Sequence, residues 1–264
     1  MNLFDITGKK AIVTGGTRGL GYGIAEGYLE AGCEVAIVGT SDKVYEVAEE
    51  FCQRGYKCHG VKGNLGKREE VYRVFQECVE KLGGDLDILL TAHGIQRRHS
   101  AEEFPVEEWD EVLNVNLTSV FLLCQEAGKI MLKKGYGKII TIASMNSFFG
   151  GQTIPAYAAA KGGLKMLTKN IASEYGEYNI QCNGIGPGYI ATPQTAPLRE
   201  IQPDGSKHPF DQFIISKTPA ARWGNPEDLM GPAVFLASEA SDFVNGQILY
   251  VDGGILAYIG KQPK

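Results

Sequence analysis

The sequence contains no apolar run long enough to cross a bilayer, and its start, Met1–Asp5, has neither the basic residues nor the apolar core of a secretion signal. Positive charge is in the minority: 26 lysines and arginines stand against 31 aspartates and glutamates, a formal net charge of -5. This balance gives no general attraction to nucleic acid or anionic membranes. We therefore expect a cytoplasmic protein that binds neither, and a local basic pocket for any anionic substrate.

Cysteines are few and scattered. The six of them show none of the short spacings of a metal site, so we expect reduced, mostly buried thiols and no metal centre. Repeats, low-complexity stretches and Pro/Gly linkers are absent as well. With 44% hydrophobic residues the chain can bury a sizeable core, and we expect a single domain over residues 1–264.

Short β-branched runs alternate with longer helical patterns along the chain. Strands of this kind between helices are typical of a parallel sheet covered on both faces, so the predicted class is α/β with a doubly wound, Rossmann-type sheet. The predicted strands are 10–14, 35–38, 86–90, 138–142, 180–185 and 247–251, and the predicted helices are 19–31, 43–54, 107–134 and 157–178.

A glycine-rich run, Thr14-Gly15-Gly16-Thr17-Arg18-Gly19-Leu20-Gly21, joins the first predicted strand to the first helix. Glycines let a backbone turn tightly and approach a pyrophosphate, and a helix N-terminus adds free N–H groups and positive potential. Its place between strand and helix makes this run a candidate dinucleotide-binding turn, although its spacing is not the usual G-x-G-x-x-G.

The end of the second strand bears on which dinucleotide binds. It closes with Gly39-Thr40-Ser41, without the carboxylate that would accept hydrogen bonds from a ribose 2′-hydroxyl, and Asp42 is expected to cap the next helix. Arg18, inside the glycine turn, suits a 2′-phosphate. These charges favour NADP(H), with NAD(H) as the alternative. The other interpretation of Arg18 is a solvated arginine at a helix start.

Tyr157 and Lys161 are four residues apart at the start of a helical pattern, which places both side chains on one helix face. A phenol is a poor base at neutral pH, but a nearby ammonium and an oxidised nicotinamide favour the phenolate. By itself, a tyrosine four residues before a lysine is expected about as often by chance. Ser144, just past a strand, adds a donor for a substrate oxygen. Asn116, among apolar residues in a helix, is by itself more typical of a satisfied core amide.

Between residues 187 and 223 the chain is rich in Pro, Gly, Thr and Gln and shows no long apolar period. A loop of this length in a compact domain is usually functional or mobile, and the crevice of such a sheet lies at the carboxyl ends of its strands. We therefore predict a substrate lid over the crevice. Its first residues, Pro187–Thr192, offer free backbone groups for a carboxamide.

At this point the sequence resembles the short-chain dehydrogenases/reductases over essentially its whole length. The resemblance rests on the T-G-x-x-x-G-x-G turn, on an Asn, a Ser and a Tyr-x-x-x-Lys in order and spacing, and on a Pro-Gly turn. It implies an oxidoreductase acting on CH–OH donors, and commonly a homotetramer. It also implies a water held by Asn116 in a proton relay through Lys161. The implied catalytic tetrad is Asn116, Ser144, Tyr157 and Lys161.

By the same resemblance, Arg18 stands where members that prefer NADP(H) carry a basic residue, and Asn64 where an Asp contacts adenine. Ile190 and Thr192 stand where the nicotinamide amide is held. One departure is the family's N-N-A-G, here Thr91-Ala92-His93-Gly94. We interpret His93 as a structural substitution, with a substrate contact as the alternative. The expected cofactor contacts are Gly15, Thr17, Arg18, Gly19, Leu20, Gly21, Thr40, Ser41, Asn64, Leu65, Ala92, Gly94, Tyr157, Lys161, Pro187, Gly188, Ile190 and Thr192.

Several stretches, among them 156–183 and 228–260, resemble family members that act on six-carbon sugar acids. The resemblance implies interconversion of gluconate and 5-keto-gluconate, with 2-dehydro-3-deoxy-gluconate or 2-deoxygluconate as alternative substrates. Such acids need a cation for the carboxylate. Arg97 and Arg98, just past a strand, are the candidate cations, and the rivals on the lid are Arg199, Lys207 and His208. The other interpretation of each is a solvated surface charge. The other predicted substrate contacts are Ser144, Asn146 and Tyr157.

Other interpretations stay open at this point. A less related ketone, such as a steroid or a cyclic ketone, would suit the same fold, since one fold hosts many chemistries. A non-catalytic NADPH-sensing protein is the alternative from another class, and the intact tetrad speaks against it. The apolar segment 254–259 is expected either at a subunit interface or as a tail buried within one subunit.

Overall fold

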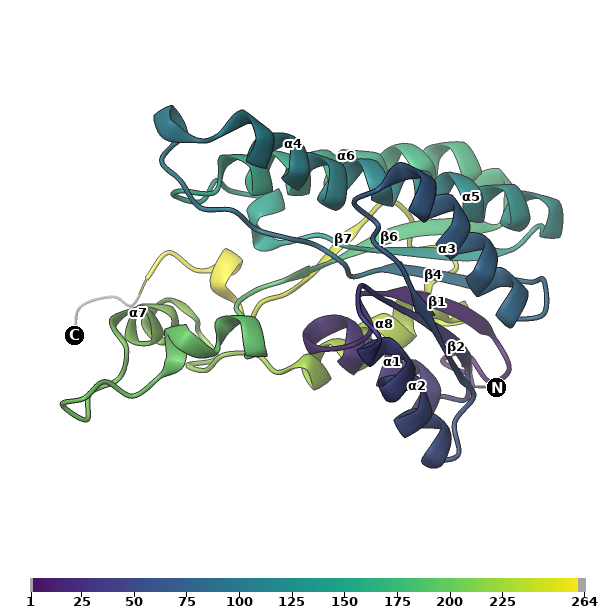
Figure 1. Cartoon of the computed structure of the whole chain (residues 1–264), viewed down its shortest axis with the longest axis horizontal. Coiled ribbons are helices and arrows are strands. Elements are labelled where there is room, and N and C mark those ends of the chain that lie inside the picture. The colour runs from purple at the N-terminus through teal and green to yellow at the C-terminus, as the bar shows by residue number, and fades with distance from the viewer. Residues whose placement is uncertain (1, 261–264) are drawn as a thin grey trace.

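The computed structural model describes residues 2–260, so the predicted domain extends beyond the described range at both ends. One sheet of seven parallel strands runs through the centre in the order β3-β2-β1-β4-β5-β6-β7, with helices on both faces (Figure 1). The order reverses between β1 and β4, because the chain builds outward to β3 and then returns to the other side. Such a reversal opens a crevice at the carboxyl ends of the two strands. The predicted doubly wound α/β fold is confirmed.

The strands are short, and most are buried, as parallel strands covered on both faces must be. They are β1 (Lys10–Thr14), β2 (Glu34–Gly39), β3 (Cys58–Lys62), β4 (Ile88–Thr91), β5 (Gly137–Ile142), β6 (Ile180–Pro187) and β7 (Ile248–Val251). β3 is missing from the predicted strands. It is a five-residue edge strand whose only β-branched residue is Val61, so its sequence carries little strand signal.

Two layers of helices enclose the sheet. On one face lie α1 (Gly19–Glu30), α2 (Lys43–Gln53) and α8 (Met230–Ala237), and on the other lie α3 (Arg68–Lys81), α4 (Val106–Leu113), α5 (Ser119–Lys134) and α6 (Pro155–Tyr175) (Figure 1). Successive strand residues point to opposite faces, so Leu89 belongs to the core under α3 and α5, and Leu90 to the core under α1. Five of the six cysteines are buried and none forms a disulfide, as expected of reduced core thiols.

The helix predicted over 107–134 is interrupted. α4 passes into α5 through a π-turn, Asn114–Thr118, that contains the buried Asn116. A π-turn inserts one extra residue into the helix and is frequent at functional sites. The helix predicted over 157–178 is α6, which ends at Tyr175 and continues as a 3-10 turn, Gly176–Tyr178.

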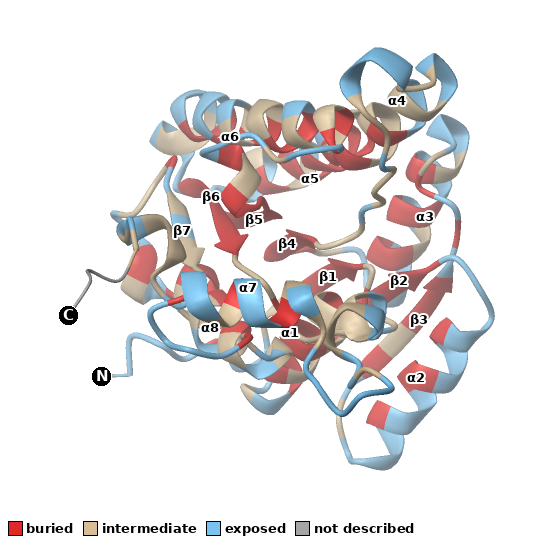
Figure 2. Ribbon diagram, turned by 90° about the vertical axis from the view of Figure 1, so that its left-hand side faces the viewer, coloured by how far each residue is buried: buried red, intermediate tan, exposed pale blue. Residues whose placement is uncertain are grey.

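The segment 187–223 is more regular than a loop, which corrects the sequence-based expectation. It contains a 3-10 helix, Pro193–Arg199, and α7 (Pro209–Lys217), and α7 lies across one side of the carboxyl ends of the strands (Figure 2). The overlooked signal is the i, i+3, i+4 spacing of Phe210, Phe213 and Ile214. The Nε1 of Trp223 donates to Asp211 Oδ1 at 2.6 Å and holds α7 to the end of the segment.

Two further expectations concern the surface. Within residues 2–260 no helix is both long and apolar enough to cross a membrane. The apolar segment 254–259 is partly buried within the subunit: Ile255, Leu256 and Tyr258 are half-buried, whereas Ile259 is 99% exposed.

Candidate active site

The glycine turn and the start of α1 form an anion cradle at the carboxyl end of β1. α1 begins at Gly19 with no side-chain cap and no acidic residue in its first turn. The first N–H groups of a helix have no acceptor within it, so these groups and the positive end of the helix dipole remain for a ligand. The glycines are needed for space, because a Cβ on Gly21 would overlap the carbonyl oxygen of Gly15. This cradle fits a pyrophosphate.

The residues around the expected ribose position carry no free carboxylate. Arg18 is exposed directly before α1, and Thr40 and Ser41 are exposed after β2. Asp42 occupies the N-cap position of α2 but makes no capping bond, so the predicted cap was wrong. Its Oδ1 instead pairs with Lys62 Nζ at 2.9 Å, since Lys62 ends the neighbouring strand β3.

Asn64 and Leu65 follow β3 at the same edge of the sheet. Asn64 is exposed, and its Oδ1 accepts the N–H of Gly66 at 3.0 Å, which leaves its amide N–H₂ group for a ligand. Leu65 is buried in the core. Asn64 is therefore available to a ligand, and the burial of Leu65 holds the turn in place.

Tyr157 and Lys161 face the crevice from the first turns of α6. Lys161 Nζ lies 5.6 Å from the centroid of the Tyr157 ring and donates to the carbonyl oxygen of Ile142 at 2.6 Å. Burial lowers the pKa of Lys161 to about 8. Burial raises the pKa of the Tyr157 phenol, and a hydrogen bond with Ser144 acts in the opposite direction. Ser144 thus acts on the phenol, and the Lys161 ammonium lies over its ring; these are the two groups expected to control its proton.

Ser144 follows β5 directly and is buried. Its Oγ accepts the N–H of Asn146 at 3.1 Å and lies 3.4 Å from Asn146 Oδ1, so Asn146 orients the hydroxyl. The Asn146 amide also donates to the carbonyl oxygen of Phe149 at 3.4 Å. Of the two predicted substrate contacts on this turn, Ser144 interacts with the Tyr157 phenol, and Asn146 interacts with Ser144.

Asn116 joins the π-turn to the chain that follows β4. Its Nδ2 donates to the carbonyl oxygen of Ile95 at 2.8 Å, and its Oδ1 accepts the N–H of Ile95 at the same distance. A Cβ on Gly94 would lie 3.0 Å from this Oδ1, so the two segments are in close contact. The amide is satisfied, as expected of a core asparagine, and it also holds Ala92–Gln96 against the site.

The chain after β6 brings the expected nicotinamide contacts to the glycine turn. A Cβ on Gly19 would lie 3.4 Å from Thr192 Cγ2. The N–H of Thr192 is not free, because it donates to Thr195 Oγ1 at 2.9 Å in a capping box that opens the helix Pro193–Arg199. The N–H of Gly188 donates to the carbonyl of Val251. Within residues 2–260 the N–H of Ile190 has no acceptor and stays available for a carboxamide oxygen.

The two arginines predicted to meet a carboxylate differ. Arg97 Nη2 pairs with Glu111 at 2.9 Å, and Arg97 is therefore occupied. Arg98 is exposed without an ion pair inside the described range, and its charge acts to lower the pKa of Tyr189, at the start of the 187–223 segment, against the larger effect of burial.

Among the rivals on the segment, two have structural roles. His208 Nδ1 accepts the N–H of Phe210 at the start of α7, and Lys207 lies 4.0 Å from Asp211. Arg199 donates to the carbonyl of Thr192 at 3.0 Å, and its buried Nε has no partner within residues 2–260. Arg98 and Arg199 are therefore the two candidates that remain for a carboxylate.

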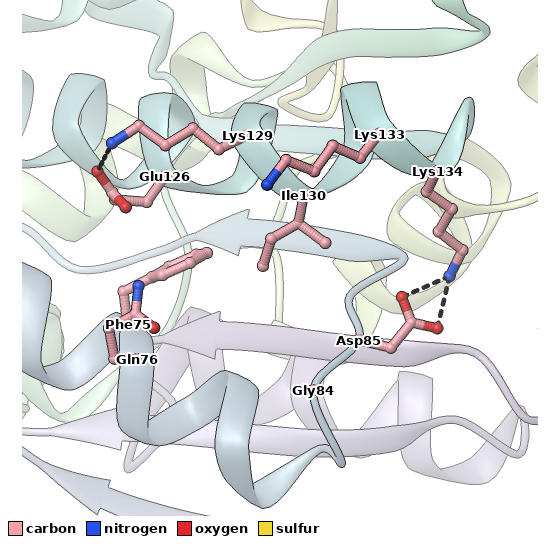
Figure 3. A pocket seen from close by; sticks show the side chains of 9 residues that line it. All are labelled: Phe75, Gln76, Gly84, Asp85, Glu126, Lys129, Ile130, Lys133 and Lys134. Carbon is pink, nitrogen blue, oxygen red and sulfur yellow. Dashed lines mark hydrogen bonds and ion pairs between the residues drawn. The ribbon is translucent and has the colours of Figure 1, made fainter.

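A groove of about 630 Å³ lies between α3 and α5, at the amino ends of the strands (Figure 3). Two of its three lysines are paired, Lys129 with Glu126 and Lys134 with Asp85. No residue predicted for the cofactor or for chemistry lines it. Folds of this class bind ligands at the carboxyl ends of the strands, so the candidate site is the crevice described above.

Comparison with known proteins gives the family. A family model described as enoyl-(acyl carrier protein) reductase matches residues 15–256. The chain is 49% identical to the 2-dehydro-3-deoxy-D-gluconate 5-dehydrogenase of Formosa agariphila, over 99% of this chain and 97% of that protein.

Solved structures agree. The 2-keto-3-deoxy-D-gluconate dehydrogenase of Streptococcus agalactiae is 50% identical, with a TM-score of 0.83 and 98% of both chains covered. A gluconate 5-dehydrogenase of Burkholderia cenocepacia, in complex with NADP and tartrate, is 37% identical, with a TM-score of 0.90 over 98% of this chain and 99% of that one. The protein with this glycine turn, this Tyr157–Lys161 pair and this sheet is an oxidoreductase of the short-chain dehydrogenase/reductase family.

Proposed function

We propose that this protein transfers hydride between NADP(H) and the C5 position of a six-carbon sugar acid, with Tyr157 exchanging the accompanying proton. The observation that carries the proposal is that the Ser144 hydroxyl and the buried Lys161 ammonium both act on Tyr157, at the crevice that the glycine turn opens. The sugar acid comes from the relatives, whose names place their chemistry at C5 of gluconate or of 2-dehydro-3-deoxy-gluconate.

When bound, the nicotinamide cofactor supplies or accepts the hydride. The uncapped start of α1 and the glycine turn would hold its pyrophosphate, and Ile190 its carboxamide. In the direction of reduction, Ser144 donates a hydrogen bond to the substrate oxygen, and the Tyr157 hydroxyl gives up its proton as that oxygen gains charge. The Lys161 ammonium stabilises the resulting phenolate. Asn116, in the π-turn, keeps the segment after β4 in place.

Arg18 is proposed to select NADP(H) over NAD(H) through the 2′-phosphate. Because a hydrogen bond between charged groups contributes about 1.5–3 kcal/mol, Arg18→Ala should raise the KM for NADPH by roughly 10–100-fold. The KM for NADH should change by less than about twofold, since NADH offers no phosphate to this side chain. Initial rates with both cofactors measure the effect. Equal changes in both KM values would show that Arg18 is only a solvated arginine.

The relatives divide between two substrates. Those at 49% and 50% identity are named for 2-dehydro-3-deoxy-gluconate or its 2-keto synonym, and the gluconate 5-dehydrogenase is 37% identical. The sequence alone placed gluconate first, whereas these identities favour 2-dehydro-3-deoxy-gluconate as the first substrate to assay. Initial rates on both acids and their keto forms, each with NADPH and NADH, decide between them. Tight NADPH binding without turnover of any sugar acid would favour a non-catalytic sensor.

Arg98 is proposed to hold the substrate carboxylate. Arg98→Ala should raise the KM for the sugar acid by roughly 10–100-fold and change kcat much less, because the carboxylate does not change charge during the reaction. Arg97→Ala is the matched control, since the neighbouring guanidinium is already paired with Glu111. An increase in KM with Arg199→Ala, and none with Arg98→Ala, would assign the carboxylate to the 187–223 segment instead.

We further propose a cytoplasmic homotetramer. The exposed Ile259 at the end of the half-buried segment 254–259 and the exposed Leu249 on the edge strand β7 support association between copies of this chain. The net charge of -5 argues against nucleic acid as a partner. Sedimentation of the purified protein tests the assembly.

A further inference from the structure

His93 is a half-buried imidazole that the proton chemistry above does not use. It stands after β4, at a position where the family carries an alanine, and it contacts two elements that the sequence does not connect. Its Nδ1 lies 2.6 Å from Thr14 Oγ1, at the end of β1, and its Nε2 lies 2.7 Å from Ser119 Oγ, at the start of α5. β1 and β4 are neighbours in the sheet, so the imidazole spans the point where the strand order reverses.

The surrounding hydrogen bonds fix the position of its proton. Ser119 Oγ lies 2.7 Å from the carbonyl oxygen of Val115, and only the hydroxyl can donate in that pair. The single proton of Ser119 is thereby used, so Ser119 Oγ accepts from His93, and His93 Nε2 carries a hydrogen. Nδ1 of the neutral ring is then an acceptor, and Thr14 donates to it.

The other end of the chain of bonds agrees with this assignment. Thr14 Oγ1 accepts the N–H of Ala92 at 3.1 Å, which leaves its own hydrogen for His93 Nδ1. Thr14 Oγ1 also accepts the N–H of His93 at 3.5 Å, so both of its acceptor positions are used, and a second proton on the ring would find no acceptor there. Burial, and secondly the charge of Lys161, lowers the pKa of His93 to about 3. The ring is therefore neutral at physiological pH.

We propose that His93 is a positioning residue: as the neutral tautomer protonated on Nε2, it joins the glycine turn to the π-turn and fixes the two halves of the site relative to one another. One end acts on Thr14, the residue before Gly15, and a Cβ on Gly15 would lie 3.0 Å from the His93 backbone. The other end acts through Ser119 on Val115, the residue before Asn116. The inference rests on the oxidoreductase proposed above, but its structural part does not depend on the substrate.

Two substitutions separate the two ends of the bridge. An asparagine amide reaches the position of Nδ1, so His93→Asn keeps an acceptor for Thr14 and loses Ser119. A glutamine amide reaches the position of Nε2, so His93→Gln keeps a donor to Ser119 and loses Thr14. Since each lost bond is worth about 1.4 kcal/mol, His93→Asn should lower kcat about tenfold with the Kd of NADPH nearly unchanged.

His93→Gln should do the reverse and raise the Kd of NADPH about tenfold with kcat nearly unchanged, and His93→Ala should do both. Thr14→Val removes the bond to His93 Nδ1, and Ser119→Ala removes the bond to His93 Nε2. These two variants replace the His93 variants in the test if a His93 variant does not fold. If the His93 variants lower only the melting temperature, with Kd and kcat of the folded enzyme unchanged, His93 is a core residue and the proposal is wrong.

The tautomer is tested directly by ¹⁵N NMR of histidine-labelled protein, where the chain offers only four histidines to assign. The His93 ring should remain neutral and protonated on Nε2 from about pH 8 to about pH 5, a range in which an ordinary histidine titrates. Titration in this range, or a proton on Nδ1, would overturn the proposal. If no sugar acid is turned over, the proposed substrate fails, while the NMR spectra and the NADPH affinities still decide the role of His93.

Discussion

Replacing Tyr157 by phenylalanine is expected to lower kcat by about 10³-fold or more, because a positioned general acid or base contributes roughly 10²–10⁴ and no second group replaces it here. The substitution removes one oxygen and keeps the ring against Lys161, so the cradle for the cofactor is unchanged. The Kd of NADPH should therefore stay within about threefold of the wild-type value, less than one lost hydrogen bond would cost. Single-turnover kinetics and fluorescence titration with NADPH measure the two effects separately.

Tyr178→Phe is a matched control, because Tyr178 lies exposed on the 3-10 turn after α6, at the far end of that helix. Its turnover should equal that of the wild type. Near-normal activity of Tyr157→Phe would show that Tyr157 does not transfer the proton, and the proton donor would then be Ser144 or a water.

Replacing Lys161 by methionine is expected to lower kcat at neutral pH by roughly 10²–10³-fold. The ammonium favours the phenolate of Tyr157, so its loss raises the pKa of the phenol further. Oxidation of the alcohol needs the phenolate as base, and its pH–rate profile should therefore move to higher pH in the variant. Lys169→Met is the control, since Lys169 lies two turns further along α6 and is exposed. An unshifted profile would contradict a role for Lys161 on the phenol.

The same variant should be more stable than the wild type. The pKa of Lys161 falls from an ordinary 10.5 to about 8 in the folded state, so the buried charge opposes folding, fully below about pH 8. The cost decreases as pH rises from 8 to 10.5, where the unfolded chain also loses the proton. Removing the Lys161 ammonium should raise the free energy of unfolding at pH 7 by up to about 3 kcal/mol. The Ile142 carbonyl, which loses its hydrogen bond, should reduce this gain by about 1 kcal/mol. Urea unfolding at pH 7 and pH 10 measures both values.

Features coded by local spacing could be predicted from the sequence. The glycine turn lies between a strand and a helix that each have a clear pattern, and Tyr157 and Lys161 share a helix face whatever surrounds them. The sheet follows from the alternation of strands and helices. The short edge strand β3 and the helix α7 were missed, because the first has almost no strand signal and the second lies in a stretch dominated by Pro and Gly.

Features made by long-range contact could not be predicted. The Asn116 amide meets the backbone of Ile95, 21 residues away, and His93 meets Thr14, 79 residues away. Only the order of the strands brings these pairs together. The difference between Arg97 and Arg98 is of the same kind, because Glu111 on α4 pairs with Arg97, whereas Arg98 has no ion pair within residues 2–260. Spacing alone treats the two arginines as equal.

The burial of the cysteines gives the protein one natural position for thiol labelling. Burial raises the pKa of Cys33, Cys58 and Cys124 to about 12, so these thiols contain almost no reactive thiolate at neutral pH. Cys52 alone is exposed, on α2, whose first turn follows the expected ribose position. A maleimide dye would therefore attach at a single site per chain, in the last turn of α2 beside the start of β3 and away from the crevice with Tyr157, without any engineered substitution.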